Sequence, residues 1–264
     1  MKIYLCPNLF TDLQKEQALE AWKVLTAEGN LCSVSAADSV SLKGNTSLGL
    51  YGPEESDLIV ALGGDGAVLR SAQIAIRADK PLVGINSGRL GFLCALSYEH
   101  LQDFFSLLDT FLLTERTLLE CSYDGKVYYA VNDVLVGKPN LGETVSLTVT
   151  VDGEEVGQVR GDGLILATPT GSTAYNRSAG GPILEHSAAS FILTPVCSRS
   201  EFNRPLIVND RRVITLAERL GNAQINVDGL SIGLLKKNAE VKRSEKTLLL
   251  YSSENNIRKL IRLA

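Results

Sequence analysis

Residues 58–67 read LIVALGGDGA, and this stretch decides the first part of the fold. Its apolar run of five residues is typical of a β-strand that is buried on both faces. A glycine-rich turn follows, and residues 67–78 have the pattern of a helix. The next apolar run, residues 81–85, completes a strand–helix–strand unit, which predicts a parallel sheet.

The segments on either side of this unit extend the same alternation. Residues 3–5 form a short apolar run that predicts a strand. Residues 12–28 carry apolar side chains near helical spacing and end at Gly29, and residues 98–113 have a second apolar helical face. We therefore expect the N-terminal part to be an α/β domain.

After about residue 115 the pattern changes to that of antiparallel β structure. Asp124-Gly125 and Asp152-Gly153 each separate two strand-like runs, and Asp-Gly accepts the positive φ angles of a hairpin turn. Residues 145–151 alternate between apolar and hydroxylated side chains, as in a half-buried strand. Further strands are expected at residues 164–167, 191–195, 206–208, 212–216 and 224–227.

These patterns predict two domains and a closing segment. The α/β domain, with the glycine turn, should occupy residues 1–114, and a mainly antiparallel β domain residues 115–246. Residues 247–264 read as a strand (247–251) and a helix (254–263) that return to the first domain.

The composition narrows the function classes. The net charge is −4 and there is no long basic block, so we expect no nucleic-acid partner. No apolar run approaches the roughly 20 residues of a membrane span, and the N-terminus lacks a signal-peptide pattern. The cysteines are odd in number and lack a CxxC pair, which favours buried thiols in a reducing, cytoplasmic compartment: Cys6, Cys32, Cys94, Cys121 and Cys197.

The turn 63–66, with sequence GGDG, is the first candidate for chemistry. Glycines at the start of a helix let a ligand approach the backbone N–H groups, an arrangement that suits phosphate. Asp65 would repel phosphates unless it binds an accompanying metal or accepts a proton from an attacking hydroxyl, and both roles belong to phosphoryl transfer. The structural alternative is a tight turn with Asp65 as helix N-cap, and for these four residues alone that alternative is slightly ahead.

A second glycine-marked loop, residues 84–92 with sequence GINSGRLGF, follows the next strand. In a parallel sheet, the loops at the carboxyl ends of neighbouring strands share one crevice, where ligands bind. A plain connection with a solvated Arg89 is an equally good interpretation of this loop by itself.

Residues 160–182, RGDGLILATPTGSTAYNRSAGGP, are the most specific stretch. A strand enters a run of small and hydroxylated residues, which leave room for a flat ligand and offer hydrogen bonds to it. Tyr175 could supply a stacking face or an oxygen. A polar turn would not need so many adjacent small residues, so a binding function is favoured.

Taken together, these motifs resemble the NAD kinase family, within the superfamily that carries a GGDG loop. The match covers residues 63–66, 84–92, Asn132-Asp133 and almost all of 162–182, in the family's order. The 162–182 segment is highly specific to the family. The GGDG loop is also found in diacylglycerol kinases and sphingoid kinases and, more distantly, in phosphofructokinases.

The resemblance implies an α/β domain joined to a β-sandwich-like domain, with the active site between them, in a homodimer or homotetramer. The implied reaction is phosphorylation of the 2′-hydroxyl of the adenosine ribose of NAD, with ATP and a divalent cation, Mg²⁺ or Mn²⁺. Asp65 matches the catalytic acid, proposed as general base. The implied phosphate-binding residues are Gly63, Gly64, Gly66 and Arg70. The implied NAD contacts are Asp65, Gly66, Phe92, Asn132, Asp133, Arg160, Asp162, Thr170, Thr173, Ala174, Tyr175, Asn176, Arg177, Ser178 and Asp228.

Several positions depart from the family's usual residues. These departures affect the implied contacts with NAD and not the implied phosphoryl transfer. Ala67 stands where threonine is common, and Asp133 is one methylene shorter than the more frequent glutamate. Leu230 replaces a polar residue, and Ser198-Arg199 replaces a Pro-His pair.

Two features of this set have plain alternatives. Arg70 and Arg77 share a helix face, and a solvated stripe is the commoner reason for such a pair. Without the family, Asn132-Asp133 would be read as a turn at a strand end. No cluster has metal-ligand spacing, so we expect the cation to arrive with ATP rather than on dedicated protein ligands.

Two other functions remain compatible with the motifs. A lipid kinase would share the GGDG loop, but it needs an apolar cleft and membrane affinity, which the hydroxyl-rich residues 168–178 argue against. A dinucleotide sensor would keep the binding pocket without turnover, and the presence of Asp65 disfavours it.

Overall fold

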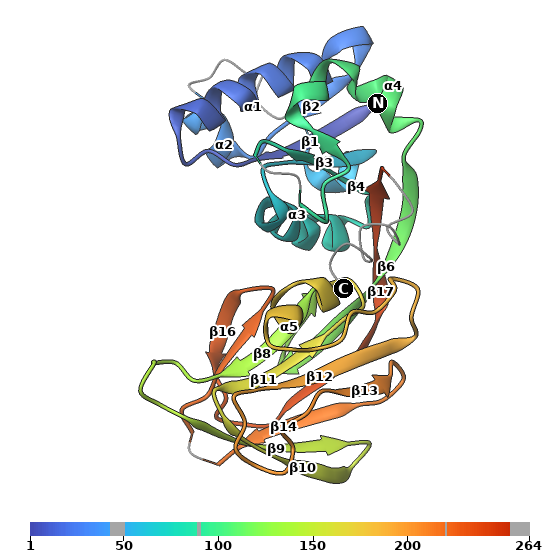
Figure 1. Ribbon diagram of the computed structural model, residues 1–264. Helices are drawn as coiled ribbons and strands as arrows, with labels where there is room; N and C mark the ends of the chain where they lie inside the picture. Colours follow the sequence, from blue (N-terminus) through green and yellow to red (C-terminus); the bar gives the residue numbers. More distant parts are fainter. Residues whose placement is uncertain (43–50, 89–90, 220, 254–264) are drawn as a thin grey trace. The chain divides into compact units, whose positions relative to one another are not determined.

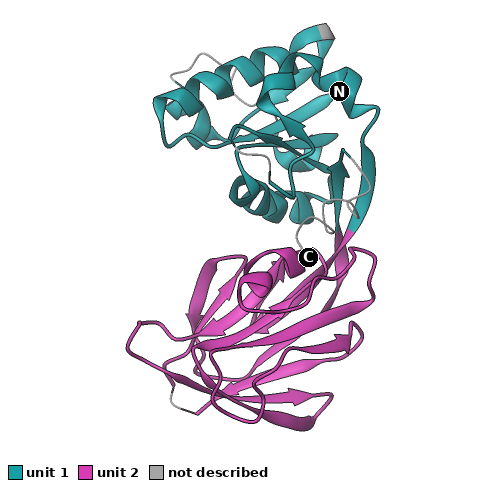
Figure 2. Ribbon diagram, viewed as in Figure 1, with its two compact units in different colours: residues 1–115, 248–255 teal, residues 116–247, 256–264 magenta. Residues whose placement is uncertain are grey.

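The computed structural model describes residues 1–42, 51–88, 91–219 and 221–253, and these fall into two compact units (Figures 1 and 2). Unit 1 holds the described residues up to Glu115 together with those from Leu248 onward, and unit 2 extends from Arg116 to Thr247. Two long strands change unit along their length, so the chain crosses the boundary within regular β structure.

Unit 1 contains a parallel sheet in the order β2-β1-β3-β4, with β5 beside β4. Its strands are β1 (Lys2–Pro7), β2 (Leu31–Ser33), β3 (Leu58–Leu62), β4 (Leu82–Asn86) and β5 (Leu96–Ser97). Its helices are α1 (Asp12–Leu25), α2 (Ala36–Ser41), α3 (Asp65–Ala78) and α4 (Phe104–Leu108). Figure 1 shows α1 on one face of the sheet and α3 on the other.

The parallel sheet is buried on both faces. Every residue of β3 and of β4 is buried, in agreement with the continuous apolar runs of the sequence. α1 packs Ala18, Ala21 and Leu25 into the core of one face. α3 presents small side chains to the other face, and a Cβ on Gly84 would lie 2.7 Å from Cγ2 of Val68, so helix and strand approach closely.

Unit 2 is a two-layer arrangement of antiparallel strands. One layer has the order β10-β9-β14-β17, with β6 beside β17 and β7 beside β6; the other has the order β13-β12-β11-β8-β15-β16. The strands are β6 (Leu112–Tyr123), β7 (Lys126–Ala130), β8 (Asp133–Gly137), β9 (Val145–Val151), β10 (Glu154–Gly161), β11 (Gly163–Ala167), β12 (Ser190–Val196), β13 (Leu206–Asn209), β14 (Ile214–Glu218), β15 (Gln224–Val227), β16 (Leu230–Leu234) and β17 (Ala239–Ser252).

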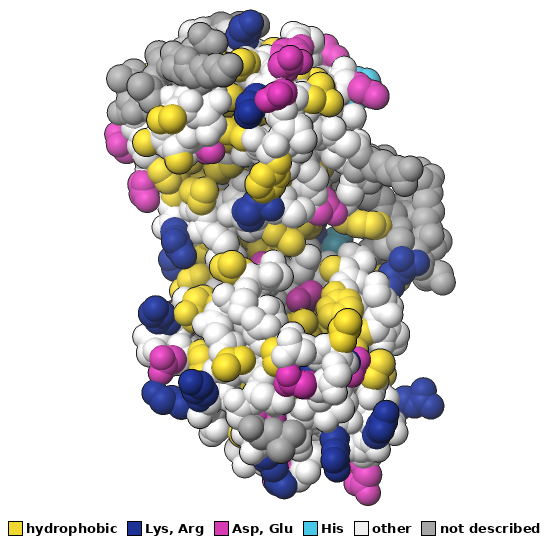
Figure 3. Space-filling model, turned by 90° about the vertical axis from the view of Figure 1, so that its left-hand side faces the viewer, with side chains coloured by type: hydrophobic (Ala, Val, Ile, Leu, Met, Phe, Trp, Pro, Cys, Tyr) yellow, Lys and Arg dark blue, Asp and Glu magenta, His cyan; other side chains and the backbone are white. Residues whose placement is uncertain are grey.

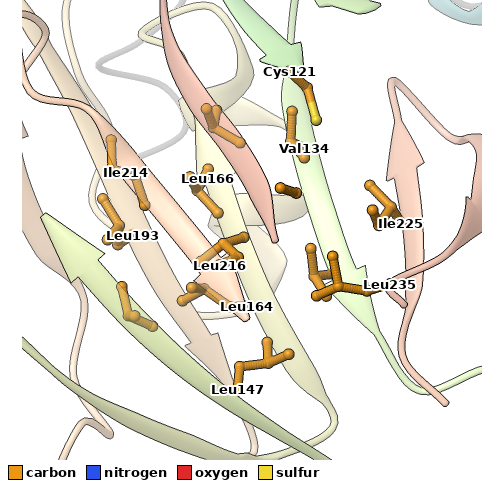
Figure 4. Close-up of a cluster of buried hydrophobic side chains, with 14 of the residues drawn as sticks. Cys121, Val134, Leu147, Leu164, Leu166, Leu193, Ile214, Leu216, Ile225 and Leu235 are labelled. Carbon is orange, nitrogen blue, oxygen red and sulfur yellow. The ribbon is translucent and has the colours of Figure 1, made fainter. Parts of the chain in front are cut away.

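The core of unit 2 lies between these layers. Figure 4 shows Leu147, Ile214 and Leu216 from one layer facing Leu164 and Leu166 from the other. The intervening residue of β11, Ile165, points to the opposite face, where it packs with Ile192, Ala179 and Leu184. The segment around α5 (Tyr175–Ser178) therefore covers the outer face of the second sheet, and β11 is buried on both sides.

The structure confirms the predicted fold class and both Asp-Gly hairpins. Asp124 and Asp152 have φ angles of 48° and 50°, and the strands on either side of each pair are antiparallel neighbours. The last strand returns to unit 1, where Leu250 pairs with Leu82 of β4 in parallel. The helix predicted for residues 254–263 lies outside the described residues.

One predicted helix is wrong. Residues 98–113 form a 3-10 helix, Tyr98–Asp103, then α4, and at Leu112 the chain is already in β6. His100, with φ −104° and ψ 17°, leaves helical geometry and interrupts the expected face. Short elements without a strong period were not predicted: β2, α2, β5, β8 and β16.

Truncation of Leu166 tests the two-layer core. Leu166→Ala should lower the free energy of unfolding of unit 2 by about 2–5 kcal/mol, because it leaves a cavity between the layers. Leu141→Ala is the matched control, since that side chain is 93% exposed and should change stability by less than about 0.5 kcal/mol. Equal urea midpoints for the two variants would contradict this account of the core.

Candidate functional site

At Gly63, the first residue of the turn between β3 and α3, the surrounding atoms leave no room for a side chain. Gly63 has φ +150° and its N–H donates to the carbonyl of Ile85 at 2.9 Å. A Cβ on Gly63 would lie 2.7 Å from the Cβ of Ala67. Gly64 is the N-cap of α3 and has no side chain to cap the helix, so N–H groups of the first turn can be offered to an anion.

Asp65, in the first turn of α3, is bonded to the second glycine-marked loop. Its Oδ2 accepts from the N–H of Phe92 at 2.9 Å and its Oδ1 from the N–H of Leu93 at 3.0 Å. A Cβ on Gly91 would lie 2.2 Å from Oδ1, so the loop can approach the carboxylate only with glycine there. An ionised carboxylate accepts about four hydrogen bonds, which leaves Asp65 able to accept from a further donor.

Arg70 reaches back along α3 toward the glycine turn. A Cβ on Gly66 would lie 3.7 Å from Nη1 of Arg70, and Nη2 lies 3.5 Å from Oδ1 of Asn8. This exposed guanidinium is thus placed beside the N-terminus of α3, where it can meet a phosphate. Asn8 was not predicted; its position directly after the first strand is the signal that could have found it.

In unit 2, residues 131–133 form a turn that enters β8, and Asp228 binds its backbone. Oδ2 of Asp228 accepts from the N–H of Val131 at 2.8 Å. Oδ1 accepts from the N–H groups of Asn132 at 2.8 Å and Asp133 at 3.1 Å. The carboxylate predicted to contact NAD is therefore occupied by three amides of the chain itself.

The same turn is held from the opposite side by the end of β11. Thr168 donates its hydroxyl to the carbonyl of Val131 at 2.6 Å, and its N–H donates to the carbonyl of Asn132 at 2.9 Å. A Cβ on Gly171 would lie 2.0 Å from that Asn132 oxygen. Residues 131–133 thus have little freedom, and the side chains of Asn132 and Asp133 start from a fixed backbone.

The Asp133 carboxyl sits in an environment that favours its neutral form. Burial raises its pKa to about 7, and the charge of Asp228 adds to that rise. Burial also raises the pKa of Asp228, to about 6, against the three amide bonds that lower it. The carboxyl group of Asp133 and that of Asp228, which binds this turn, therefore both titrate closer to neutral pH than an ordinary aspartate.

The run of residues 168–178 divides into structural and accessible side chains. Ser172 donates to the carbonyl of Pro169 at 2.7 Å and accepts from the N–H of Leu184 at 3.0 Å. Thr170 is also buried. By contrast, Tyr175, Arg177 and Ser178 are exposed, and Thr173 and Ala174 are half-buried, so these predicted contacts offer surface to a ligand.

Asn176 differs from these accessible residues, because its side chain is 0% exposed. Its Nδ2 donates to the carbonyls of Ser172 at 3.0 Å and Pro182 at 2.9 Å, and its Oδ1 accepts from the Thr194 hydroxyl at 2.6 Å. Gly181 packs against it, where a Cβ would lie 2.0 Å from Oδ1. The amide therefore holds the loop against the sheet, and its contact with NAD stays a prediction.

Arg160 and Asp162 lie at the junction of β10 and β11. The Arg160 side chain is exposed, while its N–H donates to Oγ of Ser200 at 3.1 Å. Asp162 forms an ion pair with Lys138, with 2.8 Å between Oδ1 and Nζ. Lys138 was not predicted, and nothing in its sequence context distinguishes it from other surface lysines.

The surface and composition of the described residues add three observations. On the face drawn in Figure 3, their basic and acidic side chains are interspersed rather than gathered into one stripe. None of the described helices has both the length and the apolar character needed to cross a bilayer. Nowhere in the described ranges do three or more His, Cys, Asp or Glu side chains gather as metal ligands.

Phosphoryl transfer requires a backbone that binds phosphate and a group that handles the proton of the acceptor hydroxyl. The turn before α3 offers both within a few residues, and it does so in a parallel α/β unit followed by an antiparallel β unit. These features define a kinase of the class that carries a GGDG loop.

Comparisons with known proteins identify the family within this class. Residues 46–115 match the ATP-NAD kinase N-terminal domain, and residues 131–251 match the ATP-NAD kinase C-terminal domain. The NAD kinase of Koribacter versatilis is 36% identical over 212 residues, which cover 73% of each chain. The NAD kinase of Neisseria gonorrhoeae is 37% identical over 202 residues, covering 74% of this chain and 67% of the other.

Solved structures agree with this assignment. Yeast NADH kinase, in complex with NADH, superimposes with a TM-score of 0.86 at 25% identity, over 100% of this chain and 86% of the yeast chain. An NAD kinase from Archaeoglobus fulgidus, in complex with ATP, gives 0.79 at 27% identity, over 100% and 98%. The chain belongs to the NAD kinase family.

The titration of Asp133 predicts a pH dependence of stability. In the unfolded chain an aspartate ionises near pH 4, whereas in the folded unit Asp133 ionises near pH 7, so stability falls as pH rises through this window. Asp133→Asn should therefore melt above the wild type by about 5 °C at pH 8, with the difference shrinking toward pH 4. A constant difference between pH 4 and pH 8 would contradict the raised pKa.

Proposed function

We propose that this protein phosphorylates the 2′-hydroxyl of the adenosine ribose of NAD, with ATP as donor, to give NADP and ADP. Membership of the NAD kinase family supports the overall reaction. The observation that carries the mechanism is the position of Asp65, whose carboxylate stands at the N-terminus of α3 and is held there by two amides of the neighbouring loop.

In the proposed step the ribose oxygen attacks the γ-phosphorus of ATP in line with the leaving oxygen. A bond forms between the 2′-oxygen and γ-phosphorus, the bond from γ-phosphorus to the β,γ-bridging oxygen breaks, and ADP leaves. Asp65 accepts the proton of the hydroxyl on a lone pair that Phe92 and Leu93 do not use. Mg²⁺ or Mn²⁺ enters with ATP as part of that substrate and offsets the phosphate charge.

The remaining parts of the site bind the two substrates. The N–H groups in the first turn of α3, which no side chain caps, and the guanidinium of Arg70 suit the phosphates of ATP. In unit 2, we assign NAD binding to Asn132 and Asp133 and to the accessible side chains of residues 173–178. Tyr175, 46% exposed, offers a flat face on which a base can stack. Phe92, Arg160 and Asp162 are retained as proposed NAD contacts.

We also propose that the protein acts in the cytoplasm as a homodimer or homotetramer. None of the five cysteines, all of them among the described residues, forms a disulfide, which suits a reducing compartment. The edge strand β13 exposes Leu206 and Ile207, the kind of surface that a second copy covers. Sedimentation at micromolar concentration checks the assembly, and a monomer would contradict it.

The proposed base is tested by Asp65→Asn. Turnover should fall by about 10² or more, because the amide cannot accept the proton, while NAD affinity should stay within a few-fold. Asp79→Asn is the matched control: it lies at the other end of α3, at φ 53°, a left-handed conformation that asparagine tolerates. Turnover is measured as NADP formed from NAD and Mg-ATP. Near-normal turnover of Asp65→Asn would rule out this role.

The contact between Asp65 and its loop gives a second test. Gly91→Ala should lower turnover by about tenfold or more, since its methyl group would occupy the position of the Asp65 carboxylate. Gly142→Ala, at a position with open space around it, should leave turnover unchanged. Equal turnover of the two variants would show that the position of Asp65 does not depend on the loop.

A further inference from the structure

We infer that Asp228 is a positioning residue of the proposed NAD site: it binds the backbone of residues 131–133 and so orients Asn132 and Asp133 toward the substrate, without contacting NAD itself. This inference rests on the proposed function. It assigns Asp228 a different part from the direct contact that the family resemblance implies.

The hydrogen bonds of Asp228 already use most of its acceptor capacity. Its carboxylate accepts three backbone N–H bonds at 2.8–3.1 Å, out of about four that a carboxylate can accept. Each of these bonds is charge-assisted, and together they fix three consecutive residues. A nucleotide hydroxyl would have to compete with these three amides for the carboxylate.

The backbone of Asp228 also has a fixed conformation and a hydrogen bond to the same turn. Asp228 and Gly229, with φ 48° and 80°, are the two turn residues between β15 and β16, since Val227 pairs with Leu230. The N–H of Asp228 donates to the carbonyl of Asp133 at 3.0 Å and so continues the ladder in which Val227 pairs with Val134. Asp228, in this hairpin turn, therefore binds residues 131–133 through both its side chain and its main chain.

A second Asp-Gly hairpin turn has an aspartate that also binds the backbone of a neighbouring segment, away from the proposed NAD site. Asp152 is the first residue of the Asp152-Gly153 turn, at φ 50°, and its Oδ1 accepts from the N–H of Val213 at 2.9 Å. Its own N–H donates to the carbonyl of Val213 at 2.9 Å. Asp152 thus binds the residue before β14 through its side chain and its main chain, and its Oδ2 pairs with Arg212 at 2.6 Å. β14 carries none of the proposed NAD contacts.

The charge of Asp228 also acts on the side chain that it positions. It raises the pKa of Asp133 further, in addition to the effect of burial, and it is the charged group that acts on Asp133 among the described residues. Replacing Asp228 with asparagine should therefore move the ionisation of Asp133 to lower pH as well as loosening its backbone.

The experiment compares Asp228→Asn with Asp152→Asn. We expect the KM for NAD to rise by about tenfold or more in Asp228→Asn with kcat changed less than about threefold, while Asp152→Asn stays within about twofold of wild type in both. The pH at which KM for NAD changes should move down in Asp228→Asn alone. Equal KM values for the two variants would overturn the inference.

A double substitution separates positioning from direct contact. If Asp228 acts through residues 131–133, then adding Asp228→Asn to Asp133→Ala should weaken NAD binding, measured by calorimetry, by clearly less than the product of the two single effects. Effects that multiply would show that Asp228 contacts NAD on its own, and the inference would fall.

Two further readouts keep the test informative if Asp228→Asn folds poorly. Thr168→Val loosens the same turn from its other side, because it removes the hydroxyl bonded to the carbonyl of Val131, and it should raise KM for NAD in the same direction. Amide hydrogen exchange at residues 131–133 should accelerate in both variants and not in Asp152→Asn. Unchanged exchange would overturn the inference, whereas a wild type that forms no NADP would overturn the proposed function first.

Discussion

The proposed chemistry depends on one kind of interaction, the hydrogen bond from backbone N–H groups to an aspartate carboxylate. Asp65 accepts two such bonds from the loop at residues 92–93, and Asp228 accepts three from the turn at residues 131–133. Loops and turns carry few other restraints, and charge-assisted bonds to their amides supply stiffness without a side chain from the loop. The two units thus place their predicted substrate residues by the same means.

Two glycines of the motifs are explained by the close approach of other atoms of the protein. A Cβ on Gly91 would overlap the Asp65 carboxylate that binds the amides of this loop, and a Cβ on Gly171 would overlap the backbone oxygen of Asn132. Neither residue needs glycine for a positive φ, so what they supply is space. From the sequence, such glycines are explained by a ligand that lies against the backbone. Here the atoms that lie against these two glycines belong to the protein itself.

Much of the fold followed from the sequence because its strongest signals are local. The apolar run of residues 58–62 became β3 over the same residues, and both Asp-Gly pairs became hairpin turns. The failures lie where tertiary contacts decide. β8 was missed because its first residue, Asp133, breaks an apolar pattern and is kept in the strand by the bonds of Asp228. The expected helix at residues 98–113 had a suitable apolar face, but its last residues pair as β6.

The candidate site shows the same limit at the level of single residues. The composition of residues 168–178 marks a polar loop, and it treats every hydroxyl and amide in the loop as a possible contact. Burial then separates them: Thr168, Ser172 and Asn176 bond to carbonyls and amides of unit 2, whereas Tyr175, Arg177 and Ser178 remain exposed. A loop that binds a ligand must first satisfy its own buried polar groups. A buried polar group without a hydrogen bond destabilises the fold by more free energy than one hydrogen bond to a ligand contributes. Polar residues at the base of such a loop therefore hold it in shape, and those at its surface are the ones free to meet the substrate.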